Sequence, residues 1–156
     1  MADSVIVRVP IQIREFEEAD RAALRRLFLS ARNDAFGWLP AGTHQLHDFD
    51  RSTEGERILT ALIHDRLVGF ASIWAPDRFL HCLFVDPAFQ GCGAGKALLA
   101  GCAPYFNGVA TLKCLQENRR AVRFYLSQGW RVQGEGDGAD GAFWLMELPT
   151  PASGAG

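Results

Sequence analysis

The stretch FLHCLFVDPAFQGCGAGKALL, residues 79–99, decides the fold of this chain. Its opening segment, 79–85, is apolar or aromatic apart from His81, which is typical of a buried strand. Pro87 ends the strand because proline supplies no N–H group to a sheet. Three glycines follow at alternate positions, and a helical pattern begins at Lys96. A strand, a glycine loop and a helix together point unpaired backbone N–H groups and a helix dipole at one spot, so the stretch predicts a phosphate-binding loop.

Length, composition and charge limit the class of protein. The chain has 156 residues, of which 48% are hydrophobic, enough for one core and too few for two ordinary domains. We expect a single domain over residues 1–148 and a flexible tail over 149–156. A formal net charge of −2 provides no global basic field, so nucleic acid is a poor candidate for the partner.

The sequence predicts a soluble, cytoplasmic protein with no membrane partner. No apolar run reaches the length needed to cross a membrane, and residues 1–10 contain Asp3 and Arg8, unlike a secretory signal. The cysteines form no Cys-x-x-Cys pair and are too sparse for a disulfide scaffold. We therefore expect free thiols at Cys82, Cys92, Cys102 and Cys114.

Periodic patterns place further elements on both sides of this stretch. Alternation predicts a first strand over 5–14, which Pro10 confines to a sheet edge or delays to Ile11. A helix follows Asp20, with an apolar stripe at Leu24, Leu27, Phe28 and Ala31. The remaining predicted elements are a hairpin of strands 56–63 and 67–74, a helix over 93–103, a strand over 109–115, a helix from Asn118 to a C-cap at Gly129, and strands 130–133 and 142–148 around a glycine-rich loop, 134–141.

Residues 33–51 show no clear periodicity and contain breakers at Gly37, Pro40 and Gly42. They also hold aromatic side chains, histidines and three aspartates. Two interpretations stay open: a substrate-facing loop or short helix, or a surface segment whose aromatic side chains pack onto the core.

Spacing excludes two common phosphate loops. A dinucleotide fingerprint requires Gly-x-Gly-x-x-Gly, whereas here the third glycine, Gly95, comes one residue early. A nucleotide P-loop requires Gly-x-x-x-x-Gly-Lys-Ser/Thr, but Gln90 stands at the first glycine and Ala97 at the metal-binding hydroxyl. The loop therefore predicts neither a dehydrogenase nor a kinase.

Two motifs in this chain match a known family. VDPAFQGCGAG, residues 85–95, resembles the acetyl-CoA pyrophosphate motif of the GNAT N-acetyltransferase superfamily, Gln/Arg-x-x-Gly-x-Gly/Ala behind a Val-x-Pro strand end. NRRAVRFYLSQGW, residues 118–130, looks like that family's second motif, Asn-x-x-Ala-x-x-Phe-Tyr-x-x-x-Gly-Phe/Trp. Two motifs in the right order and separation are far more specific than either alone. The resemblance covers residues 67–148, and residues 5–29 match only as a first strand and helix.

The resemblance implies an α+β fold of the GNAT type. Its centre is a mixed, mostly antiparallel sheet of about six or seven strands with about four flanking helices. The fourth and fifth strands, here 79–85 and 109–115, splay apart and admit acetyl-CoA as co-substrate. The resemblance places its pantetheine arm along the main chain of Leu83, Phe84 and Val85, as an added strand. Its pyrophosphate is expected on the loop amides of Gln90, Gly91, Cys92, Gly93, Ala94, Gly95 and Lys96, with Asn118 as a helix N-cap, a pantetheine contact or both.

Acetyl transfer to an amine also requires proton transfers. The family's second motif implies that Tyr125 protonates the departing thiolate, although a core aromatic is the structural alternative. An alkylammonium, with a pKa of about 10.4, must lose a proton before it attacks. Strand 79–85 lacks the acidic residue that the family often carries there, which makes His81 the candidate base. Other candidates, acting through water, are His44, His47 and Glu147.

Three further patterns do not support a site. The pair His44-x-x-His47 has no third zinc ligand, and residues 137–141 lack the ligand pattern of an EF-hand, so we expect no metal. Cys82 next to His81 suggests a nucleophile, but neighbouring strand residues point to opposite faces and should not pair.

The sequence leaves two functions open. The first is an N-acetyltransferase that transfers the acetyl group of acetyl-CoA to a primary amine of a small molecule or peptide, by direct attack in a ternary complex. The alternative is a non-catalytic acyl-CoA-binding sensor or regulatory domain. The acceptor and the oligomeric state, including a homodimer, stay open.

Overall fold

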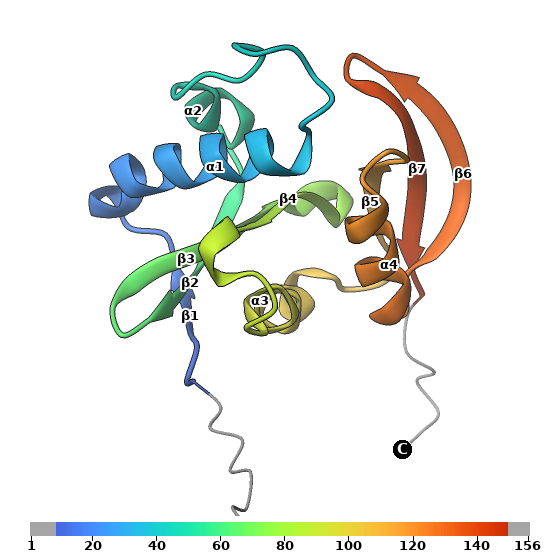
Figure 1. Ribbon diagram of the computed structural model, residues 1–156. Coiled ribbons are helices and arrows are strands. Elements are labelled where there is room, and N and C mark those ends of the chain that lie inside the picture. The colour runs from blue at the N-terminus through green and yellow to red at the C-terminus, as the bar shows by residue number, and fades with distance from the viewer. Residues whose placement is uncertain (1–8, 150–156) are drawn as a thin grey trace, which may run out of the picture.

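The computed structural model describes residues 9–149 as an alternation of strands and helices (Figure 1). The strands are β1 (Gln12–Glu15), β2 (Arg57–Ile63), β3 (Arg66–Trp74), β4 (Phe79–Val85), β5 (Ala110–Leu115), β6 (Arg131–Gly138) and β7 (Gly141–Leu148). The helices are α1 (Arg21–Ala35), α2 (Asp48–Ser52), α3 (Ala94–Cys102) and α4 (Arg119–Ser127). Short 3-10 turns cover Glu18–Asp20, Ala75–Asp77, Pro87–Phe89 and Ala103–Tyr105.

The described strands form one seven-stranded sheet in the order β1-β2-β3-β4-β5-β7-β6. Every neighbouring pair is antiparallel except β4 and β5, which are parallel. In Figure 1, α1 and α2 lie on one side of the sheet and α3 and α4 on the other. This arrangement confirms the predicted mixed, mostly antiparallel sheet with helices on its faces.

The two faces of the sheet have separate hydrophobic cores. Helix α1 buries the predicted stripe, Leu24, Leu27, Phe28 and Ala31, against side chains of β3 and β4 such as Phe70 and Cys82. On the other face α3 and α4 cover a larger core that includes Leu98, Tyr125 and Trp130. Burying a large apolar side chain contributes about 1.5–3 kcal/mol, so these faces fix which side of each helix meets the sheet.

Strands β4 and β5 separate soon after they meet. They pair at only two positions, Phe79 with Thr111 and Leu80 with Leu112, although both strands continue further. Each is held on its other side, because β4 pairs with β3 as far as Val85 and β5 pairs with β7 as far as Leu115. The splayed pair is therefore a stable part of the sheet, and the prediction of a gap between these strands is confirmed.

The first and last strands differ from the predicted bounds. Strand β1 lies at a sheet edge as expected, but it begins at Gln12, and residues 5–8 of the predicted strand lie outside the described residues. The predicted loop over 134–141 is wrong, since β6 continues to Gly138 and pairs there with Gly141. The ring of Phe143 lies over Gly136, where a Cβ atom would be only 2.6 Å from it. Cross-strand packing thus makes a strand of residues that glycine propensity alone disfavours.

The segment 33–51 is partly helical and is fixed by ion pairs. Helix α1 continues to Ala35, and α2 packs against it through Arg32 with Asp48 at 2.6 Å and Arg25 with Asp50 at 2.7 Å. The backbone N–H of Gln45 and then the neighbouring arginines lower the pKa of Asp48 to about 2. The pKa is lower in the folded chain, so this contribution to stability is present at neutral pH and is lost as the pH falls towards 2.

We predict that Gly69→Ala destabilises the fold. Gly69 lies on β3, where a Cβ atom would be 2.9 Å from the carbonyl oxygen of Phe84 and 3.3 Å from Leu98. Overpacking of this kind costs about 1–3 kcal/mol. The matched control is Gly134→Ala, whose Cβ would meet nothing within 4 Å and should change stability by less than about 1 kcal/mol. Urea unfolding measures both variants, and equal midpoints would contradict the prediction.

Candidate functional site

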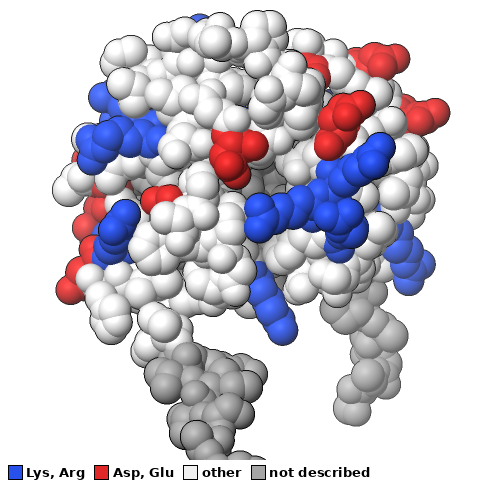
Figure 2. All heavy atoms as spheres, viewed as in Figure 1, with Lys and Arg blue, Asp and Glu red and all other residues white. Residues whose placement is uncertain are grey.

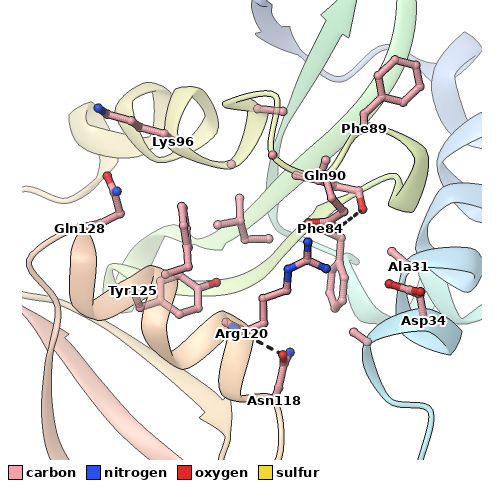
Figure 3. A pocket seen from close by; sticks show the side chains of 18 of the residues that line it. Ala31, Asp34, Phe84, Phe89, Gln90, Lys96, Asn118, Arg120, Tyr125 and Gln128 are labelled. Carbon is pink, nitrogen blue, oxygen red and sulfur yellow. Dashed lines mark hydrogen bonds between the residues drawn. The ribbon is translucent and has the colours of Figure 1, made fainter.

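A cavity of about 690 Å³ opens where the gap between β4 and β5 meets the starts of α3 and α4 (Figure 3). The last turn of α1 forms its remaining wall. It is lined by Ala31, Asp34, Ala35, Leu83, Phe84, Val85, Phe89, Gln90, Gly91, Gly93, Ala94, Gly95, Lys96, Glu117, Asn118, Arg119, Arg120, Ala121, Phe124, Tyr125 and Gln128. The structure thus brings together the two sequence motifs, which are far apart in the chain.

The edge of β4 that faces the cavity carries backbone groups without a strand partner. The N–H of Asp86 donates to Val68, so by antiparallel alternation the polar groups of Phe84 point to β3 and those of Leu83 and Val85 point to the gap. The side chain of Gln90 donates to the carbonyl oxygen of Val85 at 3.1 Å, as Figure 3 shows. Leu83 and Val85 therefore offer the hydrogen-bonding groups of an open strand, while Phe84 contributes its ring to the cavity wall.

The loop before α3 presents its backbone amides to the cavity. Gly91 and Gly93 have φ angles of 80° and 93°, which glycine adopts without strain. Gly93 is the N-cap of α3 and provides no capping side chain. Among the described residues, the amides of Gln90, Gly91, Gly93, Ala94, Gly95 and Lys96 donate to no other backbone group. Unpaired N–H groups at a helix N-terminus are a site for an anion.

Three loop residues differ in what they contribute. The N–H of Cys92 donates to the carbonyl of Phe89 at 3.4 Å, and Cys92 is not among the residues that line the cavity. A Cβ atom on Gly95 would be 3.3 Å from the ring of Phe124, so this glycine also allows α3 to approach α4 closely. The side chain of Lys96 extends away from Gln90 and Tyr125 in Figure 3, while its backbone N–H donates to no other backbone group.

Helix α4 places Asn118 and Tyr125 on the cavity wall. The side-chain oxygen of Asn118 accepts a hydrogen bond from the N–H of Ala121 at 3.3 Å, so Asn118 is the N-cap of α4. Tyr125 is 8% exposed and packs against Trp130, with its hydroxyl directed to the cavity (Figure 3). Burial raises the pKa of Tyr125, so the phenol stays protonated at neutral pH.

His81 lies outside the set of residues that line the cavity. Its Nδ1 atom is 2.9 Å from a carboxylate oxygen of Glu56, whose side chain is only 8% exposed. Cys82 and Glu56 raise the pKa of His81 to about 10, which favours the imidazolium at neutral pH. This ion pair is not apparent from the sequence, because Glu56 directly precedes β2 whereas His81 lies on β4, 25 residues further along the chain.

A bulge in β4 changes where His81 and Cys82 point. Ser72 of β3 pairs with Cys82 and Ile73 pairs with Leu80, so His81 is an extra residue without a partner. Leu80 therefore packs in the core under α3 and Cys82 in the core under α1, although they are two residues apart. The expectation that alternation separates His81 from Cys82 is wrong here. Cys82 is nevertheless buried and does not line the cavity, so it does not act there as a nucleophile.

The other predicted proton acceptors also lie outside the cavity lining. His44 is buried, and burial and then Arg32 lower its pKa. His47 is exposed and 3.8 Å from Asp50, and Glu147 lies on β7 opposite Arg131. Within residues 9–149 there is no group of three metal-ligating side chains, and no helix there is long and apolar enough to cross a membrane.

Sequence reasoning missed the charged side chains of the cavity wall. Asp34 comes from the end of α1, and Glu117, Arg119 and Arg120 come from the start of α4. The arginines directly follow Asn118, so their place in the second motif could have identified them. No local signal distinguishes Asp34 from the other aspartates nearby, because only the packing of α1 over β4 brings it to the cavity.

Solved structures with the same fold come from several organisms. A GCN5-related N-acetyltransferase from Rhodopseudomonas palustris is 17% identical and superposes with a TM-score of 0.78, covering 94% of this chain and 100% of that one. PaiA N-acetyltransferase from Thermoplasma acidophilum, solved in complex with coenzyme A, is 18% identical with a TM-score of 0.76, covering 90% of this chain and 99% of that one. At these identities the similarity establishes the fold.

Sequence comparison identifies the family. Peptidyl-lysine N-acetyltransferase YjaB of Escherichia coli is 27% identical over 93 residues, which span 60% of this chain and 63% of that relative. The chain thus matches less than two thirds of that relative's length. The acetyltransferase (GNAT) family is matched over residues 16–130, which include the loop and the whole of α4. From this match, which spans most of the sequence, we conclude that the chain belongs to the acetyltransferase (GNAT) family.

Proposed function

We propose that this chain transfers the acetyl group of acetyl-CoA to a primary amine by direct attack in a ternary complex. One observation carries the proposal: a single cavity joins the open backbone edge of β4 to the unpaired amides at the start of α3. A phosphate group suits the N-terminus of α3, and an extended arm that contains amide groups suits the strand edge. Coenzyme A contains both groups.

The residues present fit this co-substrate. The amides of Gly91, Gly93 and Ala94 would hold the pyrophosphate, with the α3 dipole adding to the attraction. Leu83 and Val85 would bind the pantetheine arm through their main chain. The Gln90 side chain donates a hydrogen bond to the carbonyl oxygen of Val85. This bond would have to break before a pantetheine N–H could donate to the same oxygen. Asn118 would contact the same arm from the start of α4 while it caps the helix.

The proposed reaction forms an N–C bond and breaks a C–S bond. The neutral amine attacks the thioester carbonyl, and an N–H of the β4 edge stabilises the oxygen that becomes negative. The sulfur leaves with the electron pair of the broken bond. Tyr125 retains its proton at neutral pH and faces the cavity, so its O–H is available to protonate the departing sulfur. The attacking nitrogen releases one proton after the N–C bond forms, and a proton taken up through water restores the phenol.

A peptidyl lysine is the acceptor that the comparisons favour. The similarity to YjaB, whose name states peptidyl-lysine acetylation, supports an alkyl amine on a peptide. A small-molecule amine is the second class of acceptor. The non-catalytic alternative, an acyl-CoA-binding domain, is favoured by one observation: the histidine on β4 is paired with Glu56 and does not line the cavity.

Thiol release from acetyl-CoA tests the proposed activity. We expect coenzyme A to bind and thiol release to increase with lysine-containing peptides or with other primary amines of a broad panel. Calorimetry measures binding independently of turnover. Tight binding without any amine-dependent thiol release would favour the sensor function, and a failure to bind coenzyme A would refute both functions.

Tyr125→Phe should lower kcat about 100-fold, because it removes the proposed proton donor and keeps the ring that packs against Trp130. The affinity for coenzyme A should change little. The chain contains one other tyrosine, Tyr105, which lies outside the cavity lining and donates a hydrogen bond of 3.2 Å to Glu15. Tyr105→Phe is therefore the matched control. A Tyr125→Phe enzyme with wild-type kcat would exclude the tyrosine from the mechanism.

The proposal that His81 is the base predicts a specific pH profile. The neutral imidazole of His81, which is the form that accepts a proton, predominates only above about pH 10. With a peptide α-amine as acceptor, whose own pKa is about 7.7–8.0, the wild-type kcat/KM should keep rising above about pH 9. His81→Gln should abolish that rise, and Glu56→Gln should move it to lower pH. An identical profile for wild type and His81→Gln would exclude His81 as the base.

A further inference from the structure

The end of α1 forms a cavity wall to which the proposed function assigns no role. Ala31, Asp34 and Ala35 line the cavity from this helix, opposite Leu83 and Phe84 of β4. Figure 3 shows the Asp34 carboxylate on this wall, on the other side of the cavity from Tyr125 and the α3 loop. Coenzyme A held by the loop and the β4 edge would leave this wall to the second substrate.

Asp34 differs from the neighbouring aspartates in having no cationic partner. Asp48 pairs with Arg32 and Arg51, and Asp50 pairs with Arg21 and Arg25. Within residues 9–149 no ion pair or side-chain hydrogen bond involves Asp34, which is exposed on the cavity wall. Its carboxylate is therefore available to a ligand.

The position of Asp34 is also unfavourable for the helix that carries it. Asp34 lies in the last turn of α1, which ends at Ala35. The helix dipole is negative at this end, so a carboxylate there destabilises the helix by about 0.3–1 kcal/mol. Neither helix stability nor an internal ion pair accounts for an acidic residue at this position, whereas the binding of a cation would.

The surroundings of Asp34 fit a cation on an alkyl chain. Ala31 and Ala35 are small and leave space beside the carboxylate. Phe84 lines the same cavity, and its ring is 6.3 Å from that of Phe36, which lies two residues after Asp34 at the end of α1. Small and aromatic side chains in the same cavity as an unpaired carboxylate suit methylene groups that end in an ammonium.

The α4 side of the cavity carries Arg119 and Arg120 beside Glu117, so its net charge is positive. Arg120 enters the cavity from α4 (Figure 3). Figure 2 shows a hollow in this face, with an acidic side chain on its left and a group of basic side chains on its right, above which lies a further acidic side chain. The two arginines outnumber Glu117 on the α4 side, whereas Asp34 is the charged residue that lines the cavity from α1, so the field favours a cationic acceptor on the Asp34 side.

We propose that Asp34 binds the ammonium group of the acceptor and makes the enzyme select alkyl amines that are cationic at neutral pH. This inference rests on the proposed acetyl transfer and adds the residue that determines acceptor specificity. Asp34 binds and positions the amine, and the bond-forming step remains with the groups of β4 and α4.

Asp34→Asn tests this assignment with a lysine-containing peptide as acceptor. We expect the KM for the peptide to rise about tenfold or more, which corresponds to the loss of about 1.4 kcal/mol of binding free energy. The Kd for coenzyme A should stay unchanged. Asp34→Glu should restore part of the affinity, and Asp77→Asn, at an exposed aspartate in the turn after β3, is the matched control.

Salt dependence provides a readout that a merely structural role would not change. The wild-type KM for the peptide should rise from low to high salt because counterions screen an ion pair, and the KM of Asp34→Asn should not. An active Asp34→Asn enzyme with wild-type KM and salt dependence would overturn the role of Asp34 and leave the proposed function intact. A wild-type protein that binds coenzyme A but acetylates no amine would overturn both.

Discussion

The separation of β4 and β5 after two parallel residue pairs is the feature on which the rest of the site depends. Backbone N–H and C=O groups are normally paired inside a sheet, and here those of Leu83 and Val85 face a gap. The gap can persist because each strand is bound on its other side, β4 by β3 and β5 by β7. A continuous β4–β5 ladder would pair these groups and close the cavity.

The cavity holds its proposed co-substrate mainly by backbone, and this explains the loop sequence. Positive φ angles at Gly91 and Gly93 turn the chain so that successive amides face one spot. Gly95 has a different function, because its missing side chain lets α3 approach Phe124 of α4. A loop that binds through amides needs few charged side chains, which agrees with the outward direction of Lys96.

The side chains to which the proposals assign a role come from three elements, and His81 among them lies outside the cavity lining. Burial in the core that α3 and α4 cover keeps Tyr125 protonated. Cys82 and Glu56 keep His81 charged at the bulge in β4. Asp34 comes from α1, on the other face of the sheet, and α1 is anchored by the arginine pairs to α2. The charge states in and around the cavity therefore depend on burial and on partners from distant parts of the chain.

Local sequence determined the elements with strong periodicity and the two motifs. The buried stripe of α1, the β2–β3 hairpin, the cap at Asn118 and the glycine loop follow from neighbouring residues, because helix spacing, turn residues and capping act over a few positions. These were enough to predict the splayed sheet by resemblance. The glycines of β6 misled the prediction, because the ring of Phe143 on the neighbouring strand is what makes that segment a strand.

Only the tertiary structure decided which charged groups meet at the cavity. The bulge that turns His81 towards Glu56 arises from the pairing of β3 with β4, and a strict alternation of side chains could not reveal it. Neighbouring residues in the sequence do not distinguish Asp34 from Asp48. In the fold, Asp34 lines the cavity and Asp48 is paired with arginines. Electrostatic contacts depend on distances across the fold, and sequence spacing fixes those distances only within a single helix or strand.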